Sequence, residues 1–92
     1  KQSDFLLNNV DINPVACEPT EILITFRSKH SYLITIDAES SQPTVKMAFD
    51  SIDEVRYGRF SQCGKYVYTL TKVGTLNIFD KSTAKLISKL NP

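Results

Sequence analysis

Cysteine and long apolar stretches are both scarce in this sequence. The 92 residues contain only two cysteines, Cys17 and Cys63, which are far apart and lack the spacing of a metal site. Because a disulfide framework needs denser cysteines, we expect two reduced structural thiols. No stretch approaches the roughly 20 apolar residues that span a bilayer, and the first residues lack the apolar segment of a signal peptide. No N-glycosylation sequon occurs, so the sequence predicts an intracellular protein without membrane contact.

The common catalytic and nucleotide-binding motifs are missing as well. No G-x-S-x-G, P-loop, H-E-x-x-H or G-x-G-x-x-G pattern occurs. The only histidine, His30, lies in an expected turn beside Lys29, and neither a carboxylate nor a second ligand has matching spacing. We therefore expect no catalytic residue, no metal and no cofactor, and a protein that is not an enzyme.

A strong charge of either sign is absent too. The formal net charge of +1 gives little attraction to nucleic acid or anionic membranes. Tyr57, Tyr66 and Tyr68 could stack on the bases of single-stranded RNA. Their spacing along expected strands instead favours a place in the core or between packed sheets. We therefore expect no direct contact with nucleic acid.

The second half of the chain carries the strongest structural pattern. Alternation predicts strands over 66–71, 75–80 and 85–90, with a turn at 62–65 before the first strand and turns at 72–74 and 81–84 between them. In the first of these, Tyr66, Tyr68 and Leu70 share one face, and Val67, Thr69 and Thr71 share the other. Both sets suit a strand that is covered on both sides. Gly64 can adopt a positive φ in the first turn, and lysines protect 85–90 as an edge strand, which we favour there over a short helix.

The first half looks like a weaker copy of the second. Strands are expected over 9–15, 21–26, 32–37 and 44–49, with a turn at 27–30 and a loop at 38–43. An acidic link over 50–54 leads to the first strand of the next unit, 55–61. Asp37 and Asp80 end equivalent strands and are 43 residues apart, which is within the about 40–45 residues of a propeller blade. We therefore divide the chain into a lead-in (1–8), a first unit (9–49), a link (50–54) and a second unit (55–92).

Four short motifs over 55–90 identify a family resemblance. They are Phe60-Ser61, Gly64-Lys65, Gly74-Thr75 and Ile78-Phe79-Asp80. In this order and spacing they resemble a WD40 repeat, with Ile78-Phe79-Asp80 where the family has its Trp-Asp ending. The resemblance implies an all-β fold, with two four-stranded antiparallel blades of a WD40-like β-propeller. Since residue 1 is not methionine and two blades cannot close a ring, we expect a fragment of a larger propeller.

The second unit also departs from the family pattern. Phe79 stands where the family has tryptophan, Thr69 where it has a strand serine, and Val73 where it has a turn aspartate. The usual Gly-His before the innermost strand is missing. The resemblance therefore implies an incomplete hydrogen-bonded network within the blade, and we expect apolar contact around Phe79 and Val73 to replace it.

By analogy with the family, the expected function is that of a non-catalytic scaffold for protein–protein interaction. Its partners would be other proteins, bound through rim loops, and the remaining blades of the propeller. The rim would consist of the link 50–54 and the turns 27–31 and 72–74. The candidate partner-binding residues on it are Arg27, Lys29, His30, Asp53 and Lys72. A finer resemblance, to late blades of the Smu-type WD40 proteins, implies a nuclear complex for pre-mRNA splicing and slightly favours the nucleus over the cytoplasm.

Two alternatives stay open at this point. The tyrosine-rich stretch 64–80 also resembles blades of lactonase-type enzymatic propellers, which need convergent polar residues or metal ligands at the central channel. Alternatively, the chain forms a small independent β-sandwich. That fold predicts a monomer that unfolds cooperatively.

Overall fold

A computed structural model describes residues 6–15, 18–39 and 42–92, which form eight β-strands and no helix. The strands are β1 (Leu7–Ile12), β2 (Thr20–Phe26), β3 (His30–Ile36), β4 (Pro43–Asp50), β5 (Val55–Phe60), β6 (Tyr66–Thr71), β7 (Leu76–Asp80) and β8 (Leu86–Leu90). The described residues therefore hold no helix long and apolar enough to cross a membrane.

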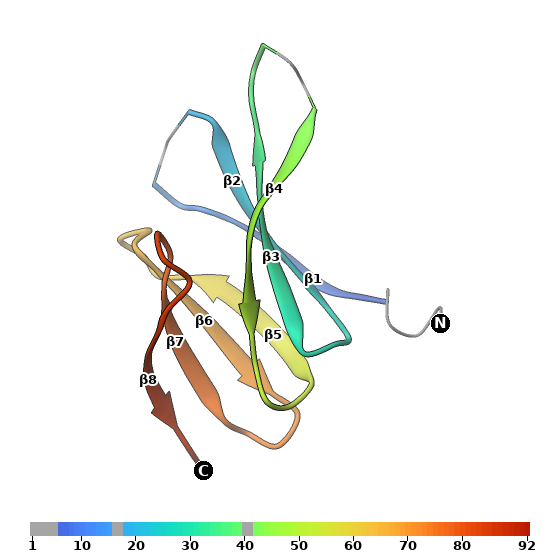
Figure 1. Cartoon of the computed structure of the whole chain (residues 1–92), viewed down its shortest axis with the longest axis vertical. Coiled ribbons are helices and arrows are strands. Elements are labelled where there is room, and N and C mark those ends of the chain that lie inside the picture. Colours follow the sequence, from blue (N-terminus) through green and yellow to red (C-terminus); the bar gives the residue numbers. More distant parts are fainter. Residues whose placement is uncertain (1–5, 16–17, 40–41) are drawn as a thin grey trace.

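The strands form two antiparallel sheets, each in chain order (Figure 1). The first sheet has the order β1-β2-β3-β4, and the second has the order β5-β6-β7-β8. Neighbouring strands are joined by turns or short loops, which antiparallel pairing permits and parallel pairing does not. The predicted all-β fold with two four-stranded antiparallel sheets is thus confirmed.

The first strand lies earlier in the chain than the expected 9–15. β1 begins at Leu7, which pairs with Phe26 of β2. It ends at Ile12, because Pro14 has no N–H group with which to continue the ladder. Leu7 and Asn8, assigned to the lead-in 1–8, are therefore part of the first sheet, while 1–5 lie outside the described residues.

The turns of the second sheet follow the prediction closely. Gly64 and Gly74 adopt φ angles of 77° and 91°, which are strained for residues with a side chain. β8 is a strand rather than a short helix, and it lies at the sheet edge with every residue exposed. Lys85 and Lys89 are therefore placed where they discourage pairing with another chain.

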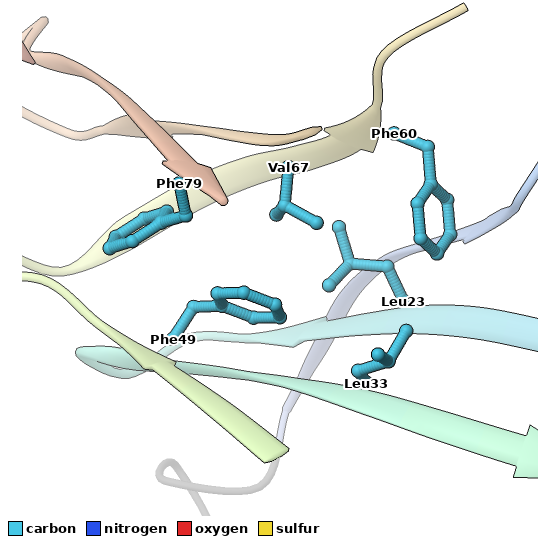
Figure 2. Packing of buried hydrophobic residues seen from close by; sticks show 6 residues of the cluster. All are labelled: Leu23, Leu33, Phe49, Phe60, Val67 and Phe79. Carbon is cyan, nitrogen blue, oxygen red and sulfur yellow. The ribbon is translucent and has the colours of Figure 1, made fainter. Parts of the chain in front are cut away.

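The core lies between the inner faces of the two sheets. Figure 2 shows its six main side chains pointing toward one another: Leu23, Leu33, Phe49, Phe60, Val67 and Phe79. Phe49 of β4 packs on Phe79 of β7 with ring centroids 5.4 Å apart. Burial of each such side chain contributes about 1.5–3 kcal/mol relative to exposure, so this layer joins the two sheets.

The outer face of the second sheet is apolar but largely uncovered. Val67, Thr69 and Thr71 of β6 are buried on the inner face of the sheet, whereas Tyr66 and Leu70 remain exposed. Within the described residues only one face of this strand is covered, and cover of its other face by further blades stays a prediction. Figure 1 shows the reason, since the first sheet lies on only one side of the second. The tyrosines lie outside the core, so of the two expected places only packing against a further sheet remains, and it stays a prediction.

The first sheet has the same two-sided character. Leu23 and Leu33 are buried on its inner face, while Ile22 and Ile34, which pair across β2 and β3, lie on the outer face and are half-buried. Further apolar side chains share that outer face, among them Val10, Ile12, Ile24, Ile36 and Val45. Each sheet thus carries one packed and one uncovered apolar face.

Candidate functional site

Three connections meet at one end of the two sheets. We call them the link rim, which consists of the β2–β3 turn (27–29), the link from β4 to β5 (50–54) and the β6–β7 turn (72–74). Figure 1 shows all three at the same end of the molecule. The backbone of the link is hydrogen-bonded to both turns. Ser51 N–H donates to the Lys29 carbonyl at 2.8 Å, and Lys72 N–H donates to the Glu54 carbonyl at 2.9 Å.

A polar network of side chains joins the link to strands β6 and β7. Asn77 Nδ2 donates to the hydroxyls of Ser51 and Thr69 at 3.3 and 3.4 Å, and the two hydroxyls lie 3.4 Å apart. Thr69 and Asn77 are buried in the second sheet, so the network ties the link to that sheet. The prediction of an apolar substitute around Val73 is wrong, because Val73 is 52% exposed. Phe79, in contrast, packs in the core as expected.

Glu54 lies between two of the predicted partner-binding residues. Its carboxylate is 3.9 Å from Arg27 Nε and 3.6 Å from Lys72 Nζ. All three side chains line an open depression of about 540 Å³, together with Asn8 and Arg56. The structure therefore brings Arg27 and Lys72, far apart in sequence, to one site.

The other predicted residues are on or next to the link rim but outside this depression. His30 is the first residue of β3 rather than part of the turn, and its Nδ1 lies 2.7 Å from Asp50 Oδ1, with both side chains exposed. The inference that no carboxylate is spaced to reach His30 is thus wrong, because the antiparallel register of β3 and β4 pairs His30 with Asp50. Lys29 is exposed in the turn, and Asp53 is half-buried in the link.

Asn8, Glu54 and Arg56 were not among the predicted site residues. Arg56 is the extra residue of a β-bulge, since Val55 pairs with Thr71 and Tyr57 with the adjacent Leu70. A bulge redirects a side chain in a way that strand alternation does not reveal. Glu54 could have been found from its place as the last acidic residue before β5.

The opposite end of the molecule carries a partly buried ion pair between the sheets. Lys81 Nζ lies 2.6 Å from Glu21 Oε1, which also accepts a hydrogen bond from Asn13 at 2.8 Å. Burial by itself raises the pKa of the Glu21 carboxyl. The hydrogen bonds from Lys81 and Asn13 outweigh burial, so the pKa is lowered from its ordinary value. This pair has a structural role, because it joins β2 to the end of β7.

Cys63 is a free thiol, exposed in the β5–β6 turn. The Ser61 hydroxyl lies 3.3 Å from its sulfur, and this hydrogen bond lowers the pKa of the thiol. Cys17 lies outside the described residues. Within residues 6–15, 18–39 and 42–92, no three His, Cys, Asp or Glu side chains are grouped as metal ligands.

The link rim thus offers charged groups for binding. In its depression, Arg27 and Lys72 of the rim and Arg56 of the adjoining β5 supply cations, Glu54 supplies a carboxylate, and backbone hydrogen bonds join the link to both turns. Comparison with known proteins adds no further constraint, since no family model matches the chain and no curated protein matches its sequence.

Proposed function

We propose that this chain is a two-blade segment of a WD40-like β-propeller and acts as a non-catalytic scaffold that binds other proteins through the link rim. The observation that carries the proposal is the joining of three connections into one charged surface. Ser51 and Lys72 hold the link to the two turns through backbone hydrogen bonds. A surface built from both sheets is suited to a protein partner, because it presents charges from distant parts of the chain in a defined arrangement.

The outer faces of the sheets support a propeller over an independent sandwich. In a β-sandwich the outward-facing residues of each strand are mostly polar. Here the outer faces present residues such as Ile24 and Ile34 on the first sheet and Tyr68 and Leu70 on the second. Faces of this kind suit packing against further blades. The remaining blades are accordingly proposed partners of this segment.

The enzymatic alternative receives no support from the strands that would line a channel. β1 and β5 are the innermost strands in the proposed arrangement, and two polar side chains of β1 are already engaged in contacts with β5. Asp11 Oδ2 accepts the Phe60 N–H at 2.8 Å, and the Asn9 side chain is bonded to Gly58. These groups hold the two sheets together. A place in a nuclear RNA-processing complex remains part of the proposal on the Smu-type resemblance alone.

Site-specific photocrosslinking in cells tests the scaffold function. A photoreactive residue is placed at Lys29 on the link rim and, as a matched control, at Ser82 in the β7–β8 turn at the other end. We expect Lys29 to capture one or more specific proteins that Ser82 does not capture. Reversing charge with Arg27→Glu and Lys72→Glu should abolish this capture. Identical products from both positions, or capture unchanged by charge reversal, would contradict the proposal.

A further inference from the structure

Arg56 is an exposed cation beside the link rim. Among residues 6–15, 18–39 and 42–92 it has no ion-pair partner, and it is exposed at the wall of the link-rim depression. The β-bulge at Val55 and Tyr57 places it there, next to Glu54 in sequence. Bulges of this kind often redirect a side chain toward a functional surface.

The two cations that face Glu54 are only loosely engaged by it. The distances of 3.9 Å from Arg27 and 3.6 Å from Lys72 exceed the usual range of an N–H···O hydrogen bond. Both side chains are more than half exposed. Their N–H donors therefore remain available to a stronger acceptor that enters the depression.

The charge of the lining matches a dianion. Among the described residues, three cations and one carboxylate line the depression of about 540 Å³, which leaves an excess of two positive charges. A phosphorylated serine or threonine carries about −1.5 to −2 charges at pH 7 and three acceptor oxygens. Arginine binds phosphate through paired N–H donors, which makes Arg27 and Arg56 suitable contacts.

Nucleic acid fits this depression less well. Sites for single strands combine cations with aromatic side chains on which bases stack. The lining residues within the described part of the chain, Asn8, Arg27, Glu54, Arg56 and Lys72, include no aromatic residue. A single cluster of cations suits one phosphate rather than a continuous backbone.

We propose that the link-rim depression binds a phosphorylated serine or threonine side chain of a partner protein, with Arg56, Arg27 and Lys72 as its contacts. This inference rests on the proposed scaffold function and names the chemistry that the partner presents. Asn8 also lines this depression, but its Nδ2 already donates to the Val55 carbonyl at 2.8 Å. The cations therefore dominate recognition.

An NMR titration tests the inference directly. The ¹⁵N-labelled chain is titrated with a peptide that has one phosphoserine flanked by glycines, and with its serine and aspartate counterparts. We expect the phosphopeptide alone to shift the amide signals of residues 54–56 and 72 in a saturable way. Arg56→Gln and Lys72→Gln should each weaken binding about tenfold or more, because each removes a charge-assisted contact. Arg59→Gln, in the same strand but outside the depression, should change it less than about twofold.

Several results would overturn the inference. They are unchanged affinity in Arg56→Gln and Lys72→Gln, equal binding of the phosphorylated and unphosphorylated peptides, or tighter binding of a single-stranded oligothymidine. The same spectra report whether each variant is folded. Lys72 lies in an exposed turn, so the affinity of Lys72→Gln tests the inference even if Arg56→Gln loses its native spectrum.

A phosphatase step separates this inference from the scaffold function. Crosslinking from Lys29 is repeated after phosphatase treatment of permeabilised cells. Loss of the captured protein supports phosphate recognition. If capture survives phosphatase but is lost in the charge-reversal variants, phosphate recognition is overturned and the scaffold function stands. If neither phosphatase nor charge reversal changes capture, both proposals are overturned.

Discussion

The carboxamide of Asn9 binds both backbone polar groups of Gly58. Its Nδ2 donates to the Gly58 carbonyl at 2.8 Å, and its Oδ1 accepts the Gly58 N–H at 3.0 Å. Because β5 is an edge strand of the second sheet, these backbone groups lack a neighbouring strand on that side. One side chain of β1 thus supplies the hydrogen bonds that a further strand would make, and joins the two sheets at their first strands.

Asn9→Ala should therefore weaken the joint between the sheets. The substitution leaves a backbone donor and an acceptor of Gly58 without partners, which costs about 1–3 kcal/mol when such groups are buried. Urea denaturation followed by circular dichroism measures the loss. Ser88→Ala, on the exposed strand β8, is the control and should stay within about 0.5 kcal/mol of the unmodified chain. Equal stability of the two variants would show that the Asn9 contact does not stabilise the fold.

Gly58→Ala should destabilise the chain through a collision rather than through backbone strain. A Cβ at Gly58 would meet the hydroxyl of Thr25 on the facing strand β2, and overpacking of this kind costs about 1–3 kcal/mol. The Thr25 hydroxyl is buried without a hydrogen-bond partner in the described part of the chain. Thr25→Ala should therefore recover part of the loss in the double variant. A double-mutant cycle measures the coupling, and purely additive effects would contradict the proposed contact.

Glu21 should make stability depend on pH in the acidic range. Its folded pKa is lowered from the ordinary value of 4.5, because the hydrogen bonds from Lys81 and Asn13 outweigh burial. The unfolded state then binds more protons near this pH. The stabilisation is present above 4.5 and is lost as the pH falls through the lowered folded pKa.

Denaturation at about pH 7 and about pH 3 checks the contribution of Glu21. Glu21→Gln should lower stability mainly at the higher pH and so reduce the difference between the two conditions. Asp80 also has a lowered pKa, owing to hydrogen bonds from Ser82, so a residual pH dependence of the same sign is expected. Glu39→Gln on the exposed β3–β4 loop serves as the control. A Glu21→Gln chain with the full pH dependence of the unmodified chain would exclude this role.

Glu54→Gln should affect binding more than stability. The ion pairs of Glu54 with Arg27 and Lys72 are long and exposed on the cation side, and pairs of this kind contribute about 0–1 kcal/mol. Removing the carboxylate frees both cations and raises the positive charge of the depression. The phosphoserine peptide should therefore bind more tightly to Glu54→Gln, as measured by the same NMR titration. Weaker binding would show that Glu54 orients the cations instead of competing for them.

Local pattern was sufficient to predict most of the strands. The alternation around Val67 and Tyr68, and the glycines at 64 and 74, depend on backbone geometry and on which residues suit a pleated sheet. These features are local in sequence. Which face is covered is not local. Within the described residues one neighbouring sheet covers 66–71, and the predicted cover on its other face would have to come from further blades.

The candidate site could be predicted only in part for the same reason. Arg27 and Lys72 were found because charged turns of a repeat meet on one rim. Arg56 was missed because a β-bulge moves it out of the alternation. The pairing of His30 with Asp50 follows from the register of β3 and β4. Register depends on contacts across the sheet, which a single sequence does not display.

The polar network beneath the link was the least predictable feature. Ser51, Thr69 and Asn77 are separated by up to 26 residues, and none of them is unusual in its local setting. The network lies in the blade for which the family resemblance implied an incomplete hydrogen-bonded network. Here a serine of the link, a threonine of β6 and an amide of β7 hold the link in place.

Sedimentation velocity of the 92-residue chain tests the propeller proposal most directly. If the outer faces are built to pack against further blades, the chain should self-associate as its concentration rises, because those faces are apolar. Ile34→Lys on the first sheet and Tyr68→Lys on the second should shift it to a monomer while leaving its circular dichroism unchanged. A chain that stays monomeric at every concentration, unfolds cooperatively and is unaffected by either substitution would instead be an independent β-sandwich.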